Sequence, residues 1–177
     1  MCGKSPVSRA MLAGLLAIAG LVARTEARAE RLPNNAWQVL AVGYPDDREV
    51  AVVLGGAEKT LSAKGICKVK WRDNTATLAL EIKNLAAASE LGGSGAQYVL
   101  WAVDSDKRVV NLGLVPASGK NAKWKVQVPF RTFGLLITAE KSPQATAPST
   151  DVALESRLPA NPDLVVPVFR VNLTLTQ

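Results

Sequence analysis

The acidic side chains are the residues of this sequence best suited to chemistry, because the chain contains no histidine. Without histidine there is no serine–histidine–aspartate triad, no cysteine–histidine pair and no histidine-based zinc site. The cysteines are Cys2 and Cys67, too few for a thiolate metal cage. Two pairs of neighbouring carboxylates remain for catalysis, Asp46 with Asp47 and Asp104 with Asp106. A hydrolase would need such a pair to face each other across its substrate.

The segment from Asp104 to Arg108 has the beginning of a calcium loop but not its continuation. Asp104 and Asp106 have the spacing of the first two ligands, and Lys107 and Arg108 then stand where another oxygen ligand and a glycine are required. We therefore predict a solvated hairpin turn and no metal, cofactor or catalytic residue. Its four charged residues, Asp104, Asp106, Lys107 and Arg108, are the candidate contact loop of this sequence.

Two stretches alternate lysine with tryptophan, CKVKWRD and KNAKWKVQV. Such a pattern can form a stacking platform for bases or sugars. Parity argues against this, since Trp71 shares a strand face with Val69 and Trp124 shares one with Val126. We predict core tryptophans and solvent-facing lysines that protect the sheet against aggregation. The alternative is that the lysines bind a polyanion such as a lipid headgroup or a wall polymer.

The elements that must position these residues are strands, because the dominant period after residue 36 is two. No long amphipathic helical stretch is present, so the sequence predicts an all-β domain, either a sandwich or a barrel. The ten predicted strands cover residues 37–42, 49–54, 66–71, 76–82, 98–103, 108–115, 123–128, 133–138, 151–155 and 168–175.

Two predicted strands, 98–103 and 134–137, are apolar at both parities and should be covered on both faces. Trp101 is therefore expected in the core. The last strand should point Phe169 and Val171 inward, and Pro167 should confine its beginning to a sheet edge or a bulge. The single cysteine after residue 29, Cys67, is expected to be a buried small hydrophobe, with pairing between chains as the alternative.

The amino terminus has the three parts of a secretory signal: basic residues, the 14-residue apolar run 10–23, and an A-x-A site ending at Ala29. We predict cleavage after Ala29, which leaves residues 30–177 as one periplasmic or extracellular domain. The alternative is an uncleaved anchor helix in a membrane-bound protein that faces the periplasm. Residues 1–29 carry +3 of the net charge of +6, so the mature domain has too weak a basic footprint for nucleic-acid binding.

The stretch YVLWAVDSDKRVVNLG, with FGLLITAEKSP and PSTDVALES after it, resembles a group of exported bacterial β-sandwich proteins with YVLWA, NLG and TAE motifs. The resemblance covers residues 66–156. More remotely, the strand order is similar to that of the extracytoplasmic domain of anti-sigma-K factors. The resemblance implies an immunoglobulin- or fibronectin-like antiparallel sandwich. It implies no catalytic residue, and it carries no anti-sigma activity, since only nine residues precede the apolar run.

The sequence thus favours a non-enzymatic, exported β-sandwich module that is an accessory or binding subunit in the bacterial cell envelope. Its expected partner is another envelope protein or a membrane complex, with membrane contact only if the amino-terminal helix is retained. One alternative is a signal-anchored structural subunit of a membrane complex. Another is a hydrolase that uses paired carboxylates.

Overall fold

All ten predicted strands are present in the computed structural model, which describes residues 35–117, 119–161 and 164–176. The signal or anchor segment 1–29 lies outside the described residues. Two short helices accompany the strands, the 3-10 helix η1 (Glu58–Thr60) and α1 (Ala88–Gly92). The strands are β1 (Ala36–Gly43), β2 (Glu49–Gly56), β3 (Lys64–Arg72), β4 (Thr75–Lys83), β5 (Gln97–Asp104), β6 (Val109–Leu114), β7 (Ala122–Val128), β8 (Thr132–Glu140), β9 (Val152–Pro159) and β10 (Val168–Thr174).

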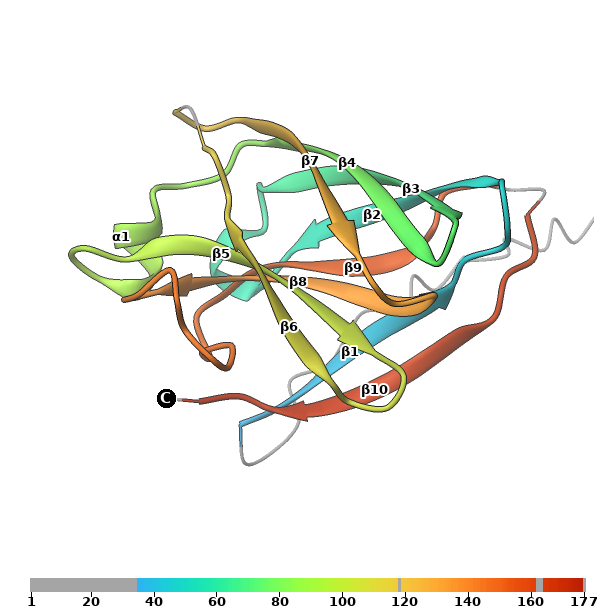
Figure 1. The fold of residues 1–177 in the computed structure, drawn as a ribbon. Coiled ribbons are helices and arrows are strands. Elements are labelled where there is room, and N and C mark those ends of the chain that lie inside the picture. The colour runs from blue at the N-terminus through green and yellow to red at the C-terminus, as the bar shows by residue number, and fades with distance from the viewer. Residues whose placement is uncertain (1–34, 118, 162–163, 177) are drawn as a thin grey trace, which may run out of the picture.

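The prediction of an all-β antiparallel domain is confirmed, and the strands form a single ten-stranded sheet. Hydrogen-bonded neighbours follow the path β7-β4-β3-β2-β9-β8-β5-β6, and this path curls into a nearly closed barrel. Strands β6 and β7 are its two ends. A second arm leaves β8 through β1 to β10, and Figure 1 shows these two strands running together along one side of the barrel.

The hairpin of β3 and β4 shows how the local sequence sets the pairing. Its connection is Asp73-Asn74, and both residues have positive φ, 50° and 58°. Two left-handed residues form the turn whose twist matches that of the flanking strands, and Asp and Asn tolerate this conformation. The register then alternates buried Val69 and Leu78 with exposed lysines, as the two-residue period predicts.

The inside of the barrel holds the larger hydrophobic core, to which strands β2 to β5 and β7 to β9 contribute. Cys67 is fully buried there, as predicted, and burial raises the pKa of its thiol. Tyr44 packs on Phe133 with ring centroids 4.7 Å apart. Trp71 is buried, whereas Trp124 on β7 is only half-buried although it faces the same core.

A second core lies on the opposite face of β5 and β8, where the arm of β1 and β10 covers them. Trp101 is fully buried in this cluster, which confirms its predicted place in the core. Both parities of residues 98–103 and 134–137 are buried because each face of these strands packs on a different core.

Two expectations about individual side chains are wrong. Phe169 is 46% exposed, because it lies near the start of β10, beyond the residues Val171, Leu173 and Leu175 that reach the second core. Asp104 was expected at the wet tip of a hairpin and is instead 3% exposed at the end of β5. Pro167 immediately precedes β10, and β10 is an edge strand, as predicted. Among the described residues no helix has the length and apolar character needed to cross a membrane.

Candidate functional site

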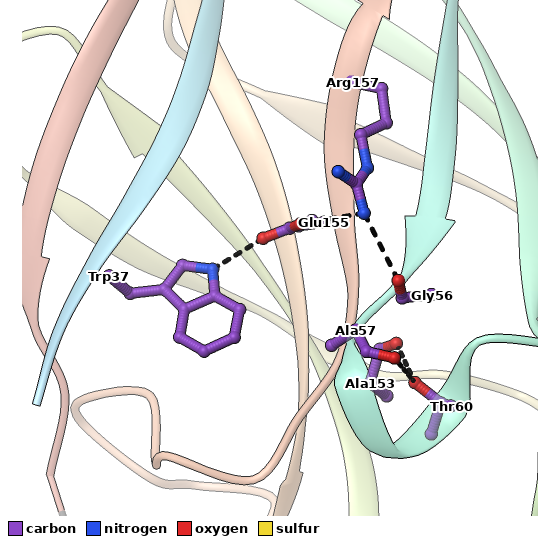
Figure 2. Close-up of polar contacts among 7 residues, drawn as sticks. All are labelled: Trp37, Gly56, Ala57, Thr60, Ala153, Glu155 and Arg157. Atoms are coloured by element: carbon purple, nitrogen blue, oxygen red, sulfur yellow. Dashed lines mark hydrogen bonds and ion pairs between the residues drawn. The ribbon is translucent and has the colours of Figure 1, made fainter. Parts of the chain in front are cut away.

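The most deeply buried carboxylate, Glu155 on β9, ties three strands together (Figure 2). Its Oε2 accepts a hydrogen bond of 2.6 Å from the indole Nε1 of Trp37 on β1. Its Oε1 lies 2.9 Å from a guanidinium nitrogen of Arg157, which also donates to the carbonyl of Gly56 on β2. A buried charge requires such partners, so Glu155 is a structural link between β1, β9 and β2.

The turn beside this cluster is fixed by Thr60 of η1, which Figure 2 shows next to the end of β2. The hydroxyl of Thr60 donates a 2.5 Å hydrogen bond to the carbonyl of Ala153 on β9. A Cβ atom at Gly56 would lie 2.0 Å from the carbonyl oxygen of Thr60. This close approach therefore requires glycine at position 56.

A second buried carboxylate, Glu140 at the end of β8, belongs to a chain of hydrogen bonds that begins at Trp101 on β5. Trp101 donates from Nε1 to Thr138 Oγ1 at 2.7 Å, and the Thr138 hydroxyl in turn donates to Glu140. Glu140 also accepts from the backbone N–H of Ser149 at 2.8 Å. The sequence interpretation missed both glutamates. The one available signal was a glutamate that directly follows an apolar stretch, VAL before Glu155 and GLLITA before Glu140.

The predicted carboxylate pair Asp46 and Asp47 lies at the surface and is engaged in ion pairs. Asp46 lies 2.6 Å from Arg131, and Asp47 lies 2.9 Å from Arg72. Within residues 35–117, 119–161 and 164–176, no three aspartate, glutamate or cysteine side chains cluster as metal ligands.

The candidate contact loop is built on Asp104, which is an anchor and not an exposed contact. Its Oδ1 accepts from the backbone N–H groups of Asp106 at 2.9 Å and Arg108 at 2.8 Å. Its Oδ2 accepts from Arg108 Nε at 2.5 Å. An aspartate at this position of a turn bonds to the following backbone, and that removes it from solvent. Asp106, Lys107 and Arg108 are exposed, as predicted.

Arg108 also reaches across to the connection between β7 and β8. Its Cζ lies over the ring of Phe130, 5.0 Å from the centroid. Lys107 adopts a positive φ of 67°, which turns the chain sharply at the tip. Through Arg108 the candidate contact loop is thereby held against the connection that follows β7.

The outer face of β3, β4 and β7 collects lysines, and we call this surface the lysine face. The pairing places Lys68, Ala79 and Lys125 side by side on successive strands. The two lysines thus flank a small residue across two strand spacings, about 10 Å. The exposed lysines of the face are Lys64, Lys68, Lys70, Lys83, Lys123 and Lys125.

Among the described residues, two glutamates lie on or beside this face of six lysines. Glu49 lies 3.2 Å from Lys68, and Glu81 lies 3.2 Å from Lys83 and 3.9 Å from Lys123. The hydrogen bond with Lys83 lowers the pKa of Glu81, and the charges of Lys83 and Lys123 lower it further. A shallow pocket of about 340 Å³ lies on the same face, with Ile66 exposed in its lining.

The barrel is open between β6 and β7, and we call this opening the β6–β7 gap. Each of these strands has a single hydrogen-bonded neighbour in the sheet, β5 for β6 and β4 for β7. The inward-facing residues at the ends of β7, Ala122 and Val128, are buried, whereas Trp124 and Val126 between them are half-buried. Figure 1 shows the ribbons of β6 and β7 diverging after the connection that joins them, and the two strands are not hydrogen-bonded to each other.

No family model, curated protein or solved structure matches this chain. The resemblance to exported β-sandwich proteins and to anti-sigma-K extracytoplasmic domains therefore stays a prediction.

Proposed function

We propose that this chain is a non-enzymatic, exported binding module, an accessory subunit of the bacterial cell envelope, whose lysine face contacts an acidic envelope protein. The observation that carries the proposal is the uncompensated charge of that face, six lysines against two glutamates. Complementary charge across an interface accelerates encounter and suppresses wrong partners.

The charges of the lysine face are available to a partner. Among the described residues, Lys64, Lys70 and Lys125 have no acidic partner. The ion pairs of Lys68, Lys83 and Lys123 are exposed, and exposed pairs contribute little free energy to the fold. A partner that supplies carboxylates can therefore replace these pairs at small cost.

Contact, and not hydrolysis, is also supported by the positions of the acids. Glu140 and Glu155 are buried and bonded to neighbouring strands, and Asp104 is bonded to its own turn. Asp46 and Asp47 lie in exposed ion pairs with arginines. No geometric observation favours the paired-carboxylate hydrolase.

The finer fold assignment, an immunoglobulin- or fibronectin-like sandwich, is also a proposal. It is supported by the way the inner faces of β3 and β4 and of β5 and β8 share one core. In a sandwich the sheet would divide into two at β9, so the pairing of β9 with its neighbours should be weak. Strand β9 bonds to both β2 and β8, and both registers are irregular. Faster amide exchange at these two pairings than at β3–β4 would support the sandwich, and equal protection would favour a continuous barrel.

Charge reversal on the lysine face tests the proposed function. A tagged Lys68→Glu/Lys125→Glu variant is incubated with envelope membranes of the source bacterium, and captured proteins are identified by mass spectrometry. The matched control, Lys141→Glu/Arg170→Glu, changes the net charge equally at exposed positions outside the lysine face. We expect the control to capture the same partner as the natural chain and the lysine-face variant to lose it. Equal capture by both variants would contradict the proposal.

The signal-anchored subunit is the alternative form of the same function. Mass spectrometry of the native amino terminus distinguishes the two forms, since cleavage after Ala29 gives a chain that starts at Glu30. A chain that retains the apolar run 10–23 would support the anchored subunit.

A further inference from the structure

We propose that the β6–β7 gap accepts an extended segment of a second polypeptide, with alternating acidic and apolar residues, which pairs as an added strand with β7. The inference rests on the proposed contact function and names the chemistry of the partner.

The backbone of the gap provides the first argument. Strands β6 and β7 are the two ends of the barrel path, and within the described part of the chain neither bonds to a second strand. An edge strand presents a row of N–H and C=O groups to any chain that approaches it. Strand β7 is seven residues long, or about 23 Å, which is enough to pair with a typical peptide strand.

The floor of the gap is apolar. Trp124 and Val126 of β7, Leu112 of β6 and Phe130 are half-buried and pack against the inner core. The inward residues of β4 on the other side of β7, such as Leu78 and Leu80, are at most 1% exposed. The apolar residues of an added strand would bring Trp124 and Val126 to similar burial, and the apolar area removed from water would favour binding.

Both ends of the gap are fixed in position. At one end, Arg108 of the candidate contact loop stacks on Phe130, and buried Asp104 holds its guanidinium in place. At the other end, backbone hydrogen bonds fix the connection of β6 and β7. The N–H of Val115 donates to the carbonyl of Tyr98, and the N–H of Leu85 donates to the carbonyl of Lys120. A gap bounded by fixed contacts loses little conformational entropy when a strand enters it.

The charges along β7 select the partner. Lys123 and Lys125 point outward from β7, and the exposed Lys120 lies just before the strand begins. Carboxylates on the outward face of an added strand would lie directly opposite Lys123 and Lys125 as cross-strand pairs. A second copy of β7, KWKVQV, would oppose lysine with lysine and is disfavoured.

The probe is a synthetic seven-residue peptide of alternating glutamate and valine, titrated into the purified protein by calorimetry. The first comparison peptide replaces glutamate with lysine, and the second replaces valine with serine. Two further peptides carry N-methyl groups on alternate backbone nitrogens, one set on each edge, and these modifications leave the protein unchanged. Hydrogen exchange of the protein with and without the first peptide locates the contact.

We expect the glutamate–valine peptide to bind and to protect amides of β7. Each substituted peptide, and at least one of the N-methylated peptides, should bind at least about tenfold more weakly. The Lys123→Gln/Lys125→Gln variant, in which both substituted residues are exposed and no like charge is placed opposite Glu81, should show the same loss with an unchanged melting temperature.

Three outcomes would overturn the inference. These are the absence of binding, equal binding of all N-methylated peptides, and equal binding of polyglutamate or anionic vesicles, which would indicate charge attraction alone. If the peptide fails while the Lys68→Glu/Lys125→Glu variant still loses its envelope partner, the added strand is wrong and the proposed function stands. If that variant keeps its partner while the peptide binds β7, the proposed role of the lysine face is wrong instead.

Discussion

Removal of the Trp101 side chain is the sharpest test of the two-core architecture. Trp101 is fully buried on the face of β5 opposite the barrel interior, and its indole donates to Thr138 at 2.7 Å. A buried tryptophan removes roughly 200 Å² from water, which corresponds to about 5 kcal/mol of transfer free energy. Measured truncations of buried aromatics to alanine cost about 3 to 5 kcal/mol.

The hydrogen bond adds little to this cost, because Thr138 keeps Glu140 as a partner after the indole is removed. We therefore expect Trp101→Ala to lower the free energy of unfolding by about 4 kcal/mol. For a domain of this size the melting temperature should fall by roughly 8 to 16 °C. Urea denaturation followed by circular dichroism measures the first quantity, and a thermal scan measures the second.

The matched control is Trp124→Ala, since Trp124 has the same side chain but is only half-buried at the β6–β7 gap. Its substitution should cost about half as much, because less apolar area is returned to water. Equal losses for the two variants would refute the burial argument. Unchanged stability of Trp101→Ala with loss of partner binding would show that Trp101 is an exposed contact residue.

Further predictions concern single ionisable groups. Asp104→Asn should lower the free energy of unfolding by about 1 to 2 kcal/mol in a urea titration, because the charge that holds Arg108 is lost, whereas exposed Asp106→Asn should leave it unchanged. Cys67 should resist thiol reagents at neutral pH until denaturant is added, since burial raises its pKa, and rapid labelling of the folded protein would contradict its position. Burial raises the pKa of Tyr98 to about 12, with a smaller contribution from a nearby glutamate. The neutral phenol therefore stabilises the fold below its unfolded pKa of about 10, and this stabilisation should be lost as the pH rises towards 12. Denaturation measured at a series of pH values, with tyrosine ionisation followed by ultraviolet absorbance, tests this expectation.

The strands could be predicted because each depends on a local pattern. The alternation in 66–71 and 76–82 places apolar side chains on one face, and Asp73-Asn74 supplies a turn that joins the two strands. The double apolar parity of 98–103 correctly indicated a strand covered on both faces. The buried positions of Trp101 and Cys67 followed from the same reasoning.

The errors came from contacts between residues far apart in the chain. Phe169 has the parity of a core residue, and only the extent of the second core decides that it stays exposed. Glu155 looks like a surface residue of an amphipathic strand until Trp37 is brought to it from 118 positions away. Asp104 is the exception, because its partners are local. The sequence around it was consistent either with a solvent-exposed aspartate or with one that bonds to the backbone of its own turn.

The sequence by itself determined the class of the fold, the strands, their buried faces and the absence of histidine-based chemistry, because these depend on residue type and on a period of two. The tertiary structure alone decided that the sheet curls into an almost closed barrel, with β6 and β7 as the two edge strands that do not pair with each other. It also gathered lysines of three strands on one face. Strand order and closure depend on pairings between distant segments, for which a local pattern carries no physical signal.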